Sequence, residues 1–106
     1  MNETAFFEAA RHLAQRTLKS PGNDQQRLAS MFERVTGRLP ESNERVWLLD
    51  FLNRQRKAFE SQPGSAEKSL KVGESPRDES LPANEHAAWT LLANLLLNLD
   101  EALTQH

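Results

Sequence analysis

Apolar residues recur along this chain with the spacing of amphipathic α-helices, most clearly toward its C-terminal end. There, one arc of a helical projection collects Ala88, Leu92, Leu95, Leu96, Leu99 and Leu103, with Trp89 at its edge. Positions three, four and seven apart form the buried face of a core helix. The pattern therefore predicts a terminal helix over residues 83–104 that lies at the centre of the fold.

Three earlier segments show the same periodicity and predict helices over residues 3–19, 24–36 and 41–60. Asp24 is expected to cap the second helix, because an acidic side chain can accept hydrogen bonds from the free amides of a first turn. Gly37 is expected to close that helix in the left-handed conformation. The inward positions of the second and third helices are predicted to be Leu28, Met31, Phe32, Val35, Leu48, Leu49, Leu52 and Phe59.

Residues 61–82 break the pattern, because proline, glycine and serine are frequent there and few side chains are apolar. We expect an irregular connection that runs over the surface and is tethered by Leu70 and Val72. One short helix, over residues 66–71 with Ser65 as its cap, is the most regular structure that this stretch predicts.

No stretch of useful length alternates between apolar and polar residues, so strands are not expected. The sequence predicts an all-α protein, a compact and mainly antiparallel four-helix arrangement with a long irregular connection before the terminal helix. Its 106 residues fit a single domain over residues 1–106. We also expect this domain to be a fragment of a larger protein.

Composition removes several classes of function. Thirteen Lys and Arg stand against fifteen Asp and Glu, and they are scattered without a basic stripe, so we expect no nucleic-acid partner. The chain has no cysteine, which removes disulfides, thiolate nucleophiles and the attachment of a c-type haem. The terminal helix is interrupted by Asn94, Asn98 and Asp100, so membrane insertion is not expected either.

The candidate chemistry is sparse. His12, His86 and His106 follow no metal-binding spacing, and each is expected to be a solvated or half-buried helix residue. Asp100 and Glu101 are adjacent, so on a helix their carboxylates point about 100° apart and do not converge on one reacting atom. The sequence therefore predicts no catalytic residue, no metal site and no bound cofactor.

A structural role fits these carboxylates better. Arg38 lies in the Gly-Arg-Leu-Pro turn between the second and third helices, and we expect it to pair with Asp100 or Glu101 on the terminal helix. Such a pair would pin the turn to that helix. Removing one member would leave a partly buried charge, at a cost of a few kcal/mol.

Apolar residues also exceed what one small core needs. The candidate interface consists of Trp47, Phe51, Leu91, Leu97 and Asn98. Asn98 belongs to a polar stripe with Asn94, Glu101 and Gln105, which is either a solvated outer face or one more covered side of the terminal helix. We expect the apolar members to be covered by another domain or by a second copy of the chain.

Three stretches resemble the C-terminal part of a domain of unknown function, number 1553, found in planctomycete and verrucomicrobial proteins. The first is FFEAARHLA at residues 6–14. The second joins VTGRLP at residues 35–40 to LLDFL at residues 48–52. The third joins AAWT at residues 87–90 to LLNLDE at residues 96–101.

The resemblance implies a parent protein that is exported and that often carries a cytochrome-c-like module. It implies no catalytic residue. The leading prediction is thus a non-catalytic helical module that packs against another domain or self-associates. The alternative is a segment that supports an exported enzyme or a cytochrome-c-associated electron-transfer assembly.

Overall fold

The helices of this chain are arranged around the last of them. The computed structural model describes residues 3–71 and 76–104, with side chains for residues 7–71 and 76–100. Within those ranges it contains five helices and no strand: α1 (Glu3–Lys19), α2 (Asp24–Thr36), α3 (Ser42–Ser61), α4 (Ser65–Leu70) and α5 (Ala83–Thr104). The predicted all-α class is confirmed, and the four long helices lie within one residue of the predicted bounds.

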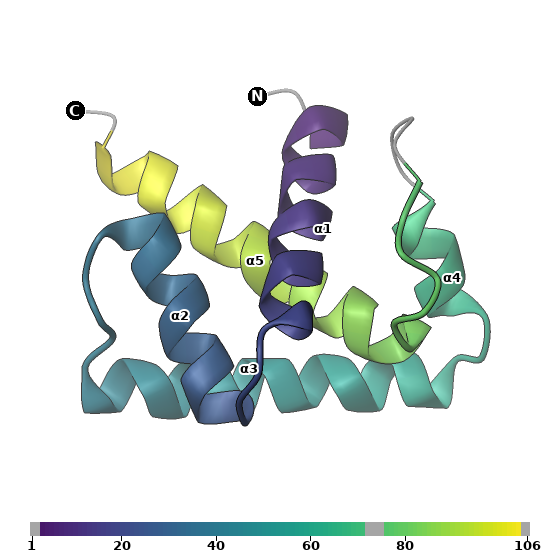
Figure 1. Ribbon diagram of the computed structural model, residues 1–106, viewed down its shortest axis with the longest axis horizontal. Coiled ribbons are helices and arrows are strands. Elements are labelled where there is room, and N and C mark those ends of the chain that lie inside the picture. Colours follow the sequence, from purple (N-terminus) through teal and green to yellow (C-terminus); the bar gives the residue numbers. More distant parts are fainter. Residues whose placement is uncertain (1–2, 72–75, 105–106) are drawn as a thin grey trace.

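Helix α5 is the central element, as the sequence predicted. It packs against α1, α2, α3 and α4. Figure 1 shows α3 along one side of the molecule, with α5 crossing obliquely behind α1 and with α4 near the start of α5. Four successive α5 residues, Ala87 to Thr90, are buried, and four successive residues cover the whole circumference of a helix. Neighbours therefore surround α5 at this level.

The buried residues of α5 nevertheless differ from the apolar arc that the sequence predicted. Trp89, expected at its edge, has no exposed surface, whereas Leu99 is 44% exposed and Leu95 is only partly buried. The main core joins α5 to the inner faces of the other long helices through Ala10, Ala14, Leu28, Met31, Phe32, Leu48, Leu52, Ala88, Trp89, Leu92, Ala93 and Leu96. The burial maximum thus lies toward the first half of α5, where most of its neighbours meet it.

The ends of α2 are fixed by local hydrogen bonds. Asn23, rather than Asp24, is its N-cap: the Asn23 side chain accepts from the Gln26 amide at 2.9 Å, and the Gln26 side chain accepts from the Asn23 amide at 2.9 Å. This reciprocal pair is a capping box. Gly37 closes the helix with φ 82°, and its amide donates to the Glu33 carbonyl at 2.9 Å, which confirms the predicted left-handed C-cap.

Helix α4 is docked more firmly than the sequence indicated. Ser65 is its first residue rather than its cap, and Gly64 precedes it with φ 88°. Ala66 and Leu70 are buried against Ala87 of α5 in a second small core. Leu70 is therefore the tether that was predicted, whereas Val72 lies outside the described residues.

Candidate functional site

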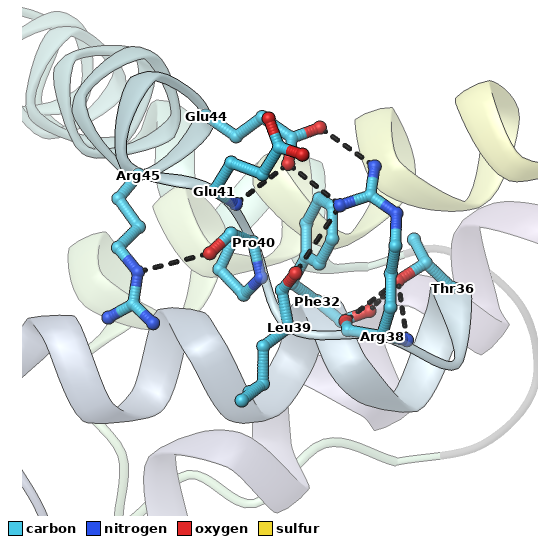
Figure 2. Close-up of polar contacts among 8 residues, drawn as sticks. All are labelled: Phe32, Thr36, Arg38, Leu39, Pro40, Glu41, Glu44 and Arg45. Atoms are coloured by element: carbon cyan, nitrogen blue, oxygen red, sulfur yellow. Dashed lines mark hydrogen bonds and ion pairs between the residues drawn. The ribbon is translucent and has the colours of Figure 1, made fainter.

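Arg38, one member of the predicted structural pair, lies in the turn between α2 and α3. Figure 2 shows the contacts of this turn. The Arg38 guanidinium donates to Glu44 Oε1 at 2.8 Å and to Glu44 Oε2 at 2.9 Å. Its Cζ also lies 4.9 Å from the centroid of the Phe32 ring. Glu44 is the partner that the structure shows for Arg38; the pairing with Asp100 or Glu101 stays a prediction, and the side chain of Glu101 lies outside the described residues.

Glu44 also holds the start of α3. Its Oε1 accepts from the Glu41 amide at 2.8 Å, which satisfies one of the free amides at the helix N-terminus. The hydrogen bonds from Arg38, followed by that from the Glu41 amide, lower the pKa of Glu44 to about 2. The pair is therefore ionised throughout the physiological range and stiffens the turn between α2 and α3.

Large apolar side chains are exposed beside this turn. Leu39 is 54% exposed, Val46 is 70% exposed and Trp47 is 53% exposed. The Trp47 ring stacks on Phe51, with centroids 6.3 Å apart and an angle of 28° between the ring planes. We call Leu39, Val46 and Trp47 the corner surface. Trp47 is held by its stacking on Phe51, and the turn that carries Leu39 is held by the Arg38–Glu44 pair.

The other predicted interface residues do not form an exposed face with Trp47. Phe51 and Leu97 are partly buried and pack against the main core, and Leu91 is partly buried as well. Asn98 is partly buried, and its amide donates to the carbonyl of Asn94 at 2.7 Å within the same helix. Of the five candidates, Trp47 alone is mostly exposed.

A second polar cluster joins three helices at the opposite end of α3. The Arg56 guanidinium donates to Asp24 Oδ2 at 2.8 Å and Oδ1 at 3.0 Å, and to Glu85 Oε1 at 2.7 Å and Oε2 at 2.8 Å. Both carboxylates lie in the first turns of their helices, where a negative charge is also favoured by the helix dipole. The hydrogen bonds with Arg56 lower the pKa of Asp24.

The third cluster surrounds His86, which has no exposed surface. Its Nε2 lies 3.2 Å from the carbonyl oxygen of Arg11 in α1, and its Nδ1 lies 3.2 Å from Nη1 of Arg77. Burial, the largest effect, lowers the pKa of His86, and the charges of Arg77 and Arg11 act in the same direction. The prediction of a solvated or half-buried His86 was therefore wrong, whereas His12 is exposed.

A cavity of about 500 Å³ lies beside this cluster. Its lining mixes three cationic side chains with two carboxylates and comes from α1, α4 and the connection: Arg11, Glu67, Leu70, Lys71, Pro76, Arg77 and Glu79. The Arg11 guanidinium donates to the Leu70 carbonyl at 2.8 Å, so α1 and α4 are joined at the cavity wall.

Among the residues that the structure describes, no three His, Asp or Glu side chains gather as metal ligands would. In the same part of the chain, none of the helices has the length and apolar character needed to cross a bilayer.

Sequence reasoning missed Arg56, Arg77 and the burial of His86. The partners of Arg56 lie 32 and 29 residues away, and no spacing rule connects residues that far apart. Asp24 and Glu85 gave no signal either, because acidic residues in the first turn of a helix are already favoured by the helix dipole.

Comparison of the chain with protein-family models, with curated proteins and with solved structures finds no match. The resemblance of residues 6–14, 35–52 and 87–101 to domain of unknown function 1553 stays a prediction.

Proposed function

We propose that this chain is a non-catalytic helical interaction module that associates through the corner surface with a second copy of itself. The observation that carries the proposal is the exposure of Leu39, Val46 and Trp47, each of which leaves more than half of its surface in water. Apolar side chains that gather beside a rigid turn are typical of an interaction site.

The charges around the corner surface favour a second copy as the partner. Val46, Asp50 and Arg54 follow one another at intervals of four on α3, so they lie on one face of the helix. Glu41 stands at the N-terminal end of α3 and Arg54 lies beyond the apolar residues, and both are exposed. When two α3 helices pack antiparallel about Trp47, the part of α3 that carries Arg54 comes opposite the end of the partner's α3 that follows Glu41.

A two-fold contact of this kind is self-complementary, because the same surface serves both copies. It is also small, since three apolar side chains and a charged rim form an interface at the low end of the size range for specific complexes. We therefore expect a weak and reversible dimer rather than an obligate one.

Sedimentation across micromolar to millimolar concentrations tests the proposal. The wild-type chain is expected to dimerise with rising concentration, and Val46→Glu is expected to stay monomeric, because two copies would then bring carboxylates together in an apolar contact. Lys68→Glu, an exposed substitution on α4 and outside the proposed contact, is the matched control and should dimerise like the wild type. A wild-type chain that stays monomeric throughout would refute self-association.

Tryptophan quenching gives a second measurement on the same samples. Trp47 is 53% exposed and Trp89 is buried, so an aqueous quencher reports mainly on Trp47. Quenching should fall as the concentration rises in the wild type and should stay constant in Val46→Glu.

A further inference from the structure

His86 is a buried titratable side chain to which the proposed function gives no role. It lies in the first half of α5 with no exposed surface, between α1 and the segment that leads into α5. We call residues 76–82 the strap. The His86 ring contacts both neighbours: the Arg11 carbonyl of α1 through Nε2, and the Arg77 guanidinium of the strap through Nδ1.

These two contacts assign the protonation state of the ring. A carbonyl oxygen only accepts hydrogen bonds, so Nε2 must carry a proton. A guanidinium only donates, so Nδ1 must be without one. The neutral ring with its proton on Nε2 satisfies both neighbours. A second proton, on Nδ1, would point at the N–H groups of Arg77 and place two cations 3.2 Å apart.

Arg77 organises the strap as well as contacting His86. The same Nη1 donates to the carbonyl of Asp78 at 3.2 Å and to that of Leu81 at 3.1 Å. On the α1 side, the Asp78 amide donates to Gln15 Oε1 at 3.0 Å, and the Asp78 carboxylate lies 2.6 Å from Nζ of Lys19. The strap is therefore held to α1 by Asp78 and to α5 by the contact between Arg77 and His86.

We propose that His86 is an acid-sensitive latch, in which protonation of the ring expels the Arg77 guanidinium and releases the strap from α5. Arg77 and Pro76 also line the cavity of about 500 Å³, so release of the strap would remove part of its wall. Neutral pH keeps the latch closed, and mild acid opens it.

The charges that face His86 set the direction of the response. Arg11 of α1 and Arg77 of the strap disfavour a protonated ring, and Asp78 of the strap favours it. From α3, Arg56 is already bound to Glu85, the neighbour of His86 in the chain. From α4, the Glu67 carboxylate lines the cavity. Burial outweighs the carboxylates and keeps the pKa of the ring below its ordinary value of 6.5.

The linkage between protonation and folding follows from that lowered pKa. The unfolded chain, whose histidine has a pKa near 6.5, binds a proton more readily than the folded chain does. The stability contributed by neutral His86 is therefore present above pH 6.5 and is lost as the pH falls below it. Asp78 takes no part in this range, because its hydrogen bond with Lys19 lowers the pKa of that carboxyl.

Amide hydrogen exchange of the whole chain, read by NMR and corrected for intrinsic rates, tests the latch. The reporter is the Leu81 amide, which is bound to the Asp78 carbonyl inside the turn that Arg77 holds together. The Asp78 amide, bound to Gln15, reports the separate attachment of the strap to α1. Between pH 6.5 and the lowered pKa of the folded chain, protection at Leu81 should fall by up to about tenfold per pH unit, because in that range the released ring binds a proton and the latched ring does not. Below the folded pKa the fall should level off. Amides of the α3 core, such as that of Leu52, should keep their protection.

Two variants separate the latch from general acid sensitivity. His86→Gln offers Arg77 an acceptor and the Arg11 carbonyl a donor without titrating, so the strap should lose its acid response. His12→Gln, on the exposed side of α1, is the control and should keep it. A strap response that persists in His86→Gln would overturn the proposal, and so would strap and α3 amides that lose protection together.

A measurement on the wild type serves if His86→Gln does not fold. The ring proton shift of His86 reports its own titration, and its midpoint should coincide with the pH at which the fall in strap protection levels off. A difference of more than about one pH unit between the ring midpoint and that feature of the protection profile would also overturn the proposal, because one unit is a tenfold difference in proton affinity.

Discussion

Replacing Arg56 tests how far one cation holds three helices together. Arg56 lies toward the end of α3 and binds carboxylates in the first turns of α2 and α5. Arg56→Met removes the charge and keeps a side chain of comparable reach over the apolar surface. The variant loses the ion pairs of Arg56 with Asp24 and with Glu85. The repulsion between the two carboxylates is then no longer offset by a cation.

The magnitude follows from the exposure of the three side chains. Arg56 is 23% exposed, Asp24 is 40% exposed and Glu85 is 37% exposed, so water screens the cluster in part. A fully exposed pair contributes at most about 1 kcal/mol, and breaking a buried pair costs about 3–5 kcal/mol. Because water screens both ion pairs in part, we expect Arg56→Met to lower the free energy of unfolding by about 2–3 kcal/mol. For a chain of this size we expect Tm to fall by roughly 10 °C.

Thermal unfolding followed by circular dichroism measures this loss, with Arg54→Met as the matched control. Arg54 lies two residues before Arg56 and forms an i,i+4 pair with Asp50 at 2.8 Å, but both side chains are mostly exposed. The control should therefore change stability by less than about 0.5 kcal/mol. Equal melting temperatures for the two variants would refute the reasoning.

A double-mutant cycle with Asp24→Asn isolates one arm of the cluster. In the wild type the pKa of Asp24 lies below 3.8, so the stability that this carboxylate contributes is present above that pH and is lost as the pH falls through the lowered value. In Arg56→Met the pKa of Asp24 should return toward its ordinary range. The coupling energy between Arg56 and Asp24 should also fall in concentrated salt.

Three smaller predictions concern the ends of α2 and the turn that follows it. Asn23→Ala removes the acceptor for the Gln26 amide and should cost about 1 kcal/mol in urea unfolding. Gly37→Ala should cost a similar amount, about 1 kcal/mol, because an added Cβ meets nothing within 4 Å and only the left-handed backbone is strained. Glu44 should titrate near pH 2 by carboxyl-carbon NMR, and Arg38→Gln should return it toward 4.5.

The boundaries of the helices were predictable because their causes are local. Helical periodicity and the glycine at the end of α2 act within a few residues, and the four long helices lie within one residue of their expected bounds. The capping residue was misplaced by one position. Asn23 and Asp24 both suit an N-cap, and the choice between them was made by Gln26, which completes the capping box, and by Arg56, which binds Asp24 from another helix.

The site residues were less predictable because their partners come from elsewhere in the fold. Arg38 binds Glu44, which the same turn already holds nearby, so little conformational entropy is lost in making that pair. The burial of His86 depends on the strap folding across it, and no periodicity in residues 76–82 indicates that path. Phe51 and Leu97 were expected at an interface, but the core of this chain covers much of both.

The central place of α5 has a consequence for synthesis. Every other helix packs against it, and it is the last helix that the structure describes to be translated. Until α5 emerges from the ribosome, Leu28, Leu52 and Leu70 therefore lack the part of their cover that α5 supplies. Nascent chains halted before Ala83 should be strong clients for chaperones, and completion of α5 should release them.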